Sequence, residues 1–284
     1  MTWTVQAVLE AAEAVVVKRG SGPARVDLAR CLAGVLGVSR LHLLLDYERP
    51  LSEDERASYR ARFQRLLDGE PLAYVMGRRE FFGRSFRVTP DVLIPRPETE
   101  TLVSAALEAL PEAAHVFEPC TGSGCVAITL ALERPDLVVT ASDVSAPALG
   151  VAAENAASLG AEVEWLKGSF WQPVAGRVFG GLVANPPYVD PARPDLFDAS
   201  LRFEPEAALF SPAGDPTFAY RELLAGGIDG LVIGAPVLFE AGIDTAEPLA
   251  DLAERHADYG DVTRVLDIAG KCRVLRLRRC AVTG

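Results

Sequence analysis

From about residue 113 onward, short apolar runs alternate with segments of helical period, and this alternation restricts the possible folds more than any other feature. It is typical of an open, mostly parallel sheet with helices packed on it. We therefore predict seven strands, the last two of which close the sheet as an antiparallel pair. The predicted strands cover residues 115–118, 138–142, 163–166, 180–184, 237–240, 262–266 and 273–277.

Residues 1 to about 75 instead carry apolar residues at helical spacing. Two apolar stripes, over 5–16 and 28–36, are each followed by a glycine, which is typical of a helix C-terminus. Ser52 and Glu55 predict a capping box at the start of a later helix. This region is either a small bundle that only packs against the main domain or a module that docks a partner.

A stretch between these two regions changes period. Two strand-like runs flank Gly83 and Arg84, which predicts a hairpin whose two-residue turn lies at these positions. The proline-rich segment 94–100 then leads into a helix. Within it, Arg96 and Glu98 are either ion partners that hold the segment or residues at the mouth of a site, and their spacing favours the structural role.

Charge and composition exclude several classes of protein. A net charge of −11 and a pI near 4.9 argue against a surface that contacts a nucleic-acid duplex along its length. The five cysteines and three histidines show neither Cys-x-x-Cys spacing nor clustering, so they indicate no disulfide framework and no metal site. We find no signal-peptide pattern and no apolar run of membrane-spanning length, and therefore expect a cytoplasmic protein.

Residues 119–124 read Pro-Cys-Thr-Gly-Ser-Gly and join the first predicted strand to a helix that begins near Cys125. A glycine-rich turn in this place lets backbone N–H groups approach a polar ligand. Asp143, about 20 residues after the glycines, either accepts hydrogen bonds from ribose hydroxyls or caps the next helix. The third glycine of dinucleotide-binding loops is missing, so S-adenosylmethionine fits better than a dinucleotide.

Two further features fall at the ends of predicted strands. Either Phe170 or Trp171 is expected to flank an adenine ring, while the other packs in the core. Residues 185–188 read Asn-Pro-Pro-Tyr, and the prolines end a buried strand and hold an amide, a carbonyl and a ring in fixed relation. This arrangement suits a small, flat, polar group such as an amide. Because ligands bind at the carboxyl ends of strands in such sheets, we predict one crevice, with a mobile loop at 196–200 beside it.

The Asn-Pro-Pro-Tyr motif resembles that of methyltransferases that act on amino groups, and four other segments narrow the resemblance. These read Gly-Glu-Pro-Leu-Ala-Tyr at 69–74, Leu-Ile-Pro-Arg-Pro-Glu-Thr-Glu at 93–100, Arg-Phe-Glu-Pro at 202–205 and Leu-Asp-Ile-Ala-Gly-Lys at 266–271. Together the motifs make the chain similar to the HemK/PrmC family of peptide chain release factor N5-glutamine methyltransferases. The similarity runs from the N-terminal helices to the last strand.

The resemblance implies a fold and a division of the chain. The fold is a class I, Rossmann-like methyltransferase sheet of seven mostly parallel strands, with a small N-terminal all-helical domain joined to it by a β-hairpin. The expected domains are a release-factor-docking domain over 1–75, a hairpin linker over 76–97 and a catalytic domain over 98–284.

The resemblance also implies a reaction and its residues. A methyl group passes from S-adenosyl-L-methionine to the side-chain amide nitrogen, N5, of the glutamine in the Gly-Gly-Gln motif of release factors, leaving S-adenosyl-L-homocysteine and using no metal. The implied cofactor-binding residues are Glu118, Cys120, Thr121, Gly122, Ser123, Gly124, Asp143, Phe170 and Asn185. The implied substrate-binding residues are Asn185, Pro186, Pro187 and Tyr188, of which Asn185, Pro186 and Tyr188 are expected to be catalytic.

Two positions depart from the family pattern. Cys120 replaces the first glycine of the loop, and Ser169 stands where members usually carry Asp, so either could weaken cofactor affinity. For the chemistry we hypothesise that the Asn185 side-chain oxygen and the Pro186 carbonyl accept the two amide hydrogens, while Tyr188 packs against the amide plane. The nitrogen would then sit about 3–3.5 Å from the methyl carbon, ready for in-line transfer.

Three alternatives compete with this interpretation. A glutamine methyltransferase for a ribosomal protein would share the chemistry, but the N-terminal match favours release factors. An adenine-N6 DNA methyltransferase shares the motif, but the acidic charge argues against it. A cofactor-binding scaffold without activity would leave the intact motif idle. We expect release factors as protein partners, no direct contact with nucleic acid or membrane, and a monomer.

Overall fold

The computed structural model describes residues 3–194 and 199–281, and the chain divides into two compact units. The first combines Met1–Arg78 with Asp198–Phe203, and the second combines Arg79–Phe197 with Glu204–Gly284. Of the loop expected at 196–200, residues 196–198 lie outside the described residues, and Ala199 begins the 3-10 helix η3 (Ala199–Phe203).

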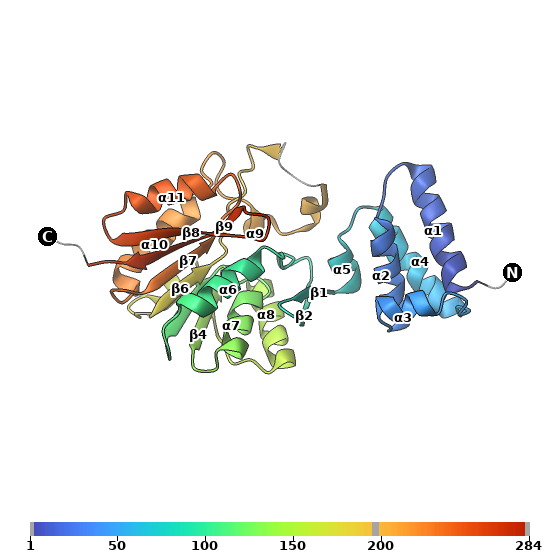
Figure 1. Ribbon diagram of the computed structural model, residues 1–284, viewed down its shortest axis with the longest axis horizontal. Coiled ribbons are helices and arrows are strands. Elements are labelled where there is room, and N and C mark those ends of the chain that lie inside the picture. Colours follow the sequence, from blue (N-terminus) through green and yellow to red (C-terminus); the bar gives the residue numbers. More distant parts are fainter. Residues whose placement is uncertain (1–2, 195–198, 282–284) are drawn as a thin grey trace. The chain divides into compact units, whose positions relative to one another are not determined.

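The first unit is helical, as predicted (Figure 1). Gly20 and Gly37 both end helices in the left-handed conformation, with φ of 75° and 67°. The capping box is confirmed: the Ser52 hydroxyl accepts from the Glu55 N–H at 3.1 Å, and the Glu55 carboxylate accepts from the Ser52 N–H at 2.8 Å. The helices are α1 (Val5–Arg19), α2 (Arg25–Leu36), α3 (Arg40–Leu45), α4 (Glu53–Leu67) and α5 (Leu72–Met76).

The β-hairpin turns one residue earlier than predicted. Strands β1 (Arg78–Phe81) and β2 (Arg84–Arg87) pair, so the turn residues are Phe82 and Gly83, and the prediction of Gly83 and Arg84 is wrong. Both turn residues have positive φ, 48° and 72°, which matches the twist of a hairpin. The N–H of Phe82 donates to Glu100 Oε1 at 2.8 Å, and this contact helps to hold a non-glycine residue in an uncommon conformation.

The second unit is built on a seven-stranded sheet with the order β5-β4-β3-β6-β7-β9-β8. The strands β3 to β7 are parallel, and β9 is antiparallel to both of its neighbours, which confirms the predicted mostly parallel sheet and its closing pair. Strand order changes direction at β3, where a ligand crevice is expected outside the carboxyl ends. The strands are β3 (His115–Pro119), β4 (Val138–Asp143), β5 (Glu164–Lys167), β6 (Gly181–Ala184), β7 (Pro236–Glu240), β8 (Tyr259–Leu266) and β9 (Cys272–Arg279).

Helices cover both faces of this sheet (Figure 1). Helices α6 (Thr99–Ala109), α7 (Cys125–Glu133) and α8 (Ala146–Leu159) pack on one face, and α10 (Phe218–Gly230) and α11 (Ala246–Glu254) on the other. The remaining helices are the short α9 (Glu206–Leu209) and the 3-10 helix η1 (Gln172–Val174). Because strand side chains alternate, Val116 and Val183 enter the first core while Phe117 and Leu182 enter the second. The central strands β3 and β6 are therefore buried on both faces of the sheet.

Candidate active site

The turn between β3 and α7 presents its backbone to a pocket. Cys120, Gly122 and Gly124 have φ of 60°, 55° and 78°, so the backbone is left-handed at three of the six positions in the turn 119–124. The Thr121 N–H donates to the Ser142 carbonyl at 3.1 Å, which ties the turn to β4. The predicted glycine-rich loop is thus present between a strand and a helix. Cys120 adopts a backbone conformation that favours glycine, and glycine is the residue that the family pattern has at this position.

The two glycines of the loop serve different purposes. A Cβ on Gly124 would lie 2.9 Å from both Ile128 Cδ1 and Trp165 Cη2, so only glycine lets the helix pack this closely. A Cβ on Gly122 would meet no protein atom within 4 Å, and Gly122 lines the pocket. Gly124 therefore provides the close packing that the third glycine supplies in dinucleotide-binding loops.

Glu118 braces the loop from within β3. Its side chain is buried, and its Oε2 accepts hydrogen bonds from the Thr121 hydroxyl at 2.7 Å and the Ala127 N–H at 3.0 Å. Burial raises the pKa of Glu118 well above its usual range, and the two hydrogen bonds only partly oppose this. The carboxyl thus links the strand, the loop and the first turn of α7.

Asp143 ends β4 and joins two backbone segments. Its Oδ2 accepts from the Gly122 N–H and its Oδ1 from the Ser145 N–H, both at 2.9 Å. The cap of α8 is Ser145, whose hydroxyl accepts from the Ala148 N–H, so the alternative that Asp143 caps this helix is wrong. Burial raises the pKa of the Asp143 carboxyl, and the backbone N–H groups that it accepts from oppose the shift.

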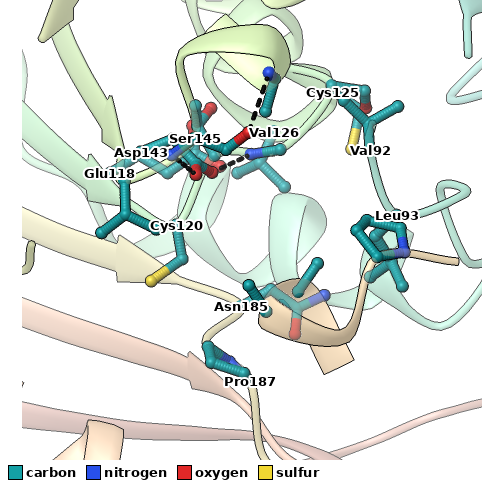
Figure 2. A pocket seen from close by; sticks show the side chains of 18 of the residues that line it. Val92, Leu93, Glu118, Cys120, Cys125, Val126, Asp143, Ser145, Asn185 and Pro187 are labelled. Carbon is teal, nitrogen blue, oxygen red and sulfur yellow. Dashed lines mark hydrogen bonds between the residues drawn. The ribbon is translucent and has the colours of Figure 1, made fainter. Parts of the chain in front are cut away.

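The loop and the strand ends border a pocket of about 320 Å³ (Figure 2). This volume lies in the range of small-molecule sites. Figure 2 shows Asn185 and Pro187 across the pocket from Asp143 and Ser145. The residues implied by the resemblance that line it are Glu118, Cys120, Thr121, Gly122, Ser123, Asp143, Phe170, Asn185 and Pro187. Gly124, Pro186 and Tyr188 are not among its lining residues.

The two aromatic residues after β5 separate into different environments. Phe170 lines the pocket beside Ser169. Trp171 packs in the core, where its Nε1–H donates to the Leu223 carbonyl at 2.8 Å and its ring leaves no room for a Cβ at Gly226. Of the two alternatives for an adenine-flanking residue, the structure therefore leaves Phe170 beside the pocket.

The Asn-Pro-Pro-Tyr segment directly follows β6. The half-buried side chain of Asn185 lines the pocket, and its Nδ2 donates to Thr99 Oγ1 at 3.4 Å. Tyr188 is engaged elsewhere: its hydroxyl donates to Glu240 Oε1 at 3.3 Å, and its ring packs against Gly242. The motif thus divides between a residue that faces the pocket and a residue anchored behind it.

Sequence-based reasoning missed Thr99 and Glu240. Glu240 ends β7, next to β6, and only 2% of its surface is exposed. Burial raises its pKa to about 7, and the hydroxyls of Thr99 and Tyr188 lower it. The available signal was an acidic residue at the end of the apolar run Val-Leu-Phe-Glu, at the same edge of the sheet as Asn185.

Both charged residues of the proline-rich segment form ion pairs, which confirms the favoured structural role, but their partners lie outside the segment. Arg96 pairs with Glu204, and Glu98 lies 3.5 Å from Arg273, so Arg96 and Glu98 are not each other's partner. Glu204 is buried and also accepts from the Ile94 N–H at 3.0 Å. Arg96 also lines the pocket whereas Glu98 does not, so the alternative that placed them at the mouth of a site holds for Arg96 alone.

The residues of the pocket fit S-adenosylmethionine. A carboxylate stands at the end of β4 for a ribose, an aromatic ring follows β5, and the loop offers open space at Gly122. Over residues 3–194 and 199–281, the structure contains no cluster of three or more His, Cys, Asp or Glu residues that could hold a metal ion. Within the same described ranges, no helix is both long and apolar enough to cross a membrane.

Known proteins resemble the chain over most of its length. The PrmC N-terminal domain matches residues 7–77, and the methyltransferase small domain matches residues 98–203. A release factor glutamine methyltransferase from Neisseria gonorrhoeae is 41% identical over 252 residues, which are 88% of this chain and 92% of the relative. One from Geobacter sulfurreducens is 35% identical over 254 residues, 89% of each chain.

The solved structures agree in fold. A methyltransferase from Pyrococcus furiosus matches with a TM-score of 0.51 at 19% identity, covering 77% of this chain and 98% of that one. Together with the sheet order, this similarity identifies a class I methyltransferase fold. Because the curated relatives exceed 30% identity over nearly the whole chain, the chain belongs to the release factor glutamine methyltransferase family.

Proposed function

We propose that this enzyme transfers a methyl group from S-adenosyl-L-methionine to the N5 side-chain amide nitrogen of the glutamine in the Gly-Gly-Gln motif of peptide chain release factors. The observation that carries the proposal is the position of Asn185, whose amide lines the same pocket as Gly122 and Asp143. A group suited to bind an amide and a loop suited to bind a nucleoside therefore face one cavity.

The cofactor would be held by the loop, by Asp143 and by Phe170. Each Asp143 oxygen accepts one backbone N–H, and a carboxylate has about four acceptor sites, so two remain for ribose hydroxyls. The Phe170 ring offers an apolar face to adenine, and the remaining implied contacts come from Glu118 and residues 120–124. When bound, S-adenosylmethionine supplies a methyl group on a sulfonium, and S-adenosylhomocysteine is the product.

The chain itself orients the substrate amide. An amide nitrogen is a poor nucleophile because its lone pair is delocalised into the carbonyl. We propose that Asn185 Oδ1 and the Pro186 carbonyl accept its two hydrogens, which favours charge on the nitrogen and fixes the direction of its lone pair. The side-chain nitrogen of Asn185 is already turned to Thr99, and this leaves Oδ1 as the available acceptor. Holding the two reactants in this geometry makes methyl transfer effectively a unimolecular step, which lowers its barrier.

Tyr188 has a narrower role in this proposal than the sequence suggested. Its hydroxyl donates to Glu240 and its ring packs against Gly242, so it contributes by anchoring the motif. Burial raises the pKa of Tyr188 further above its usual range, and the Glu240 carboxyl adds to the shift. The phenol therefore stays protonated at neutral pH and does not act as a base.

Release factors are proposed as partners on the basis of the relatives. The matching relatives are named release factor glutamine methyltransferases, and the helical unit matches the PrmC N-terminal domain. We propose that residues 1–75 dock the release factor, and that the protein acts in the cytoplasm as a monomer. The net charge of −11 disfavours a direct nucleic-acid substrate.

The proposal is tested by offering competing acceptors. The full-length protein is incubated with methyl-labelled S-adenosylmethionine and, separately, with a release factor, the same factor with its Gly-Gly-Gln glutamine changed to glutamate, purified ribosomal proteins and duplex DNA. We expect label only on the unmodified release factor. Label on the glutamate variant, on a ribosomal protein or on DNA would contradict the proposed substrate.

A further inference from the structure

Asn185 is connected to a buried carboxyl that does not line the pocket. Its Nδ2 donates to Thr99 Oγ1 at 3.4 Å, and Thr99 is 2% exposed. The Thr99 hydroxyl lies next to the Glu240 carboxyl and lowers its pKa. Tyr188 donates to Glu240 Oε1, whereas Glu240 Oε2 has no hydrogen-bond partner within 3.5 Å among the described residues. Thr99 therefore lies between the amide in the pocket and a carboxyl with an open acceptor.

The direction in which the Thr99 hydroxyl donates its hydrogen bond determines the orientation of the Asn185 side-chain amide. A threonine hydroxyl has one proton and two acceptor lone pairs, and an ionised carboxylate only accepts. If the Thr99 hydroxyl donates its hydrogen bond to Glu240, its oxygen can only accept from Asn185, and this selects the side-chain nitrogen of Asn185. A hydrogen bond to an ionised carboxylate is about twice as strong as a neutral one, so this direction is favoured.

The orientation matters because the two ends of an asparagine amide have nearly the same shape. With Nδ2 on Thr99, Asn185 presents an acceptor to the pocket. With the amide turned over, it would present an NH₂ group to the NH₂ group of a substrate amide, and donors do not bind donors. The side chain needs a contact from behind to distinguish these two states.

We propose that Thr99 and Glu240 are positioning residues for methyl transfer: the Glu240 carboxylate accepts a hydrogen bond from the Thr99 hydroxyl, and Thr99 holds the Asn185 amide with its oxygen toward the substrate. This inference rests on the proposed function, in which Asn185 Oδ1 accepts a hydrogen from the substrate amide. Thr99 lines the pocket beside Asn185 whereas Glu240 does not, and in this proposal both act through Asn185.

The protonation state of Glu240 then controls the direction of the hydrogen bonds that join Glu240, Thr99 and Asn185. A protonated Glu240 can donate to Thr99, whose own proton then turns to Asn185 and favours the reversed amide. Because burial raises the pKa of Glu240 to about 7, turnover should fall as the pH drops through this value. The titratable and charged groups around this carboxyl are Glu98, Tyr188, Arg273, Tyr220 and Cys125.

The sequence makes a direct test possible. Asn155 and Asn185 are the two asparagines of the chain, so labelling with [15N]asparagine gives two side-chain NH₂ pairs in an NMR spectrum of the full-length protein. Asn185→Ala removes one pair and so assigns both. Asn155 is an internal reference, because its Nδ2 donates to the Arg87 and Ser123 carbonyls.

The variants separate positioning from folding. Thr99→Val keeps the shape but removes the hydroxyl, Thr99→Ser restores it, and Thr101→Val makes the same change two residues along α6. We expect Thr99→Val to shift the Asn185 pair but not the Asn155 pair, and to lower kcat about 10- to 100-fold with little change in KM. Thr99→Ser should restore most of the parent kcat and the parent position of the Asn185 resonances. Thr101→Val should change neither quantity. Glu240→Gln should remove the fall of kcat between pH 8 and pH 6.

Two results would overturn the inference: Asn185 resonances that do not respond to Thr99→Val, or a Thr99→Val enzyme that keeps kcat within about threefold of the parent. Failure of the proposed function gives a different result, because the parent enzyme would then methylate no glutamine. In that case the NMR spectra still decide whether Thr99 orients Asn185.

Discussion

The Gly122 N–H donates to Asp143 Oδ2 at 2.9 Å, so the loop after β3 is fastened to the residue that ends β4. The same carboxylate accepts from Ser145 at the start of the next helix segment. Asp143 therefore holds the shape of the site in addition to its proposed contact with ribose. Replacing Asp143 should weaken cofactor binding for two reasons: a hydrogen-bond acceptor for ribose is lost, and the loop is no longer held in place.

Asp143→Ala is expected to weaken S-adenosylmethionine binding about 10- to 150-fold. A hydrogen bond to a charged group contributes about 1.5–3 kcal/mol, which corresponds to this range. Isothermal titration calorimetry measures the change, with Asp136→Ala as the control because Asp136 is exposed, pairs with Arg134 and does not line the pocket. Equal loss of affinity in both variants would mean that Asp143 has no special role.

The two loop glycines should respond differently to alanine. In Gly124→Ala the new Cβ meets Ile128 and Trp165, so we expect a loss of about 1–3 kcal/mol in the free energy of unfolding from overpacking, in addition to backbone strain. Gly122→Ala adds only the strain of a left-handed residue, about 1–2 kcal/mol, but puts a methyl group at the pocket. Urea unfolding and cofactor titration separate the two effects. The prediction fails if Gly122→Ala is the less stable protein.

Cys120 tests the tolerance of the loop for a side chain. Its φ of 60° favours glycine, so Cys120→Gly should bind the cofactor at least as tightly as the parent. Cys120→Val places a β-branched residue in the same conformation and should lose about 1–3 kcal/mol of folding stability. Calorimetric titration and thermal unfolding check the pair. A valine variant as stable as the parent would show that the loop relaxes freely.

Glu240 should make stability depend on pH. Its pKa is about 7 in the folded protein, above the ordinary value near 4.5, so between these values the folded state binds more protons than the unfolded state. Its contribution to stability therefore falls as the pH rises from about 4.5 to 7. Glu240→Gln lacks this loss, and its unfolding free energy relative to the parent should rise by about 3 kcal/mol over this window. Denaturant unfolding at pH 5 and pH 8 measures it, and a difference independent of pH would contradict the prediction.

Asn185→Ala should abolish most of the turnover and spare cofactor binding. Removing a group that acts mainly in the transition state costs about 100- to 1000-fold in kcat. We expect the dissociation constant of S-adenosylmethionine to change by less than about threefold, because Asp143 and the loop are intact. Rapid-quench methyl transfer and calorimetry report the two quantities. Near-normal turnover would remove Asn185 from the mechanism.

The strands, the glycine loop and the proline-ended strand β6 were predictable because each has a local signal. Apolar runs mark buried strands, and glycine and proline have backbone preferences that hold in any context. The position of Asp143 at the end of β4, beside the loop, followed from its spacing to the glycines. These features place the loop and the strand-end residues of the pocket lining from the sequence, but not the residues that other segments contribute.

The errors arise where a distant contact decides the local structure. The hairpin turn includes Phe82 at positive φ, and its N–H is bound to Glu100, which lies 18 residues away. Asn185 contacts Thr99 across 86 residues, and Arg96 reaches Glu204 across 108. No periodicity or spacing in the sequence encodes such pairs, so the buried groups behind Asn185 could only be found in the structure.

The most direct test of the central proposal is fragmentation mass spectrometry of the Gly-Gly-Gln peptide, after incubating a release factor with S-adenosylmethionine and either the parent enzyme or Asn185→Ala. We predict a single methyl group on the glutamine side-chain nitrogen with the parent and almost none with the variant. A methyl group on another atom or residue, or equal methylation by both proteins, would contradict the proposed site and its role.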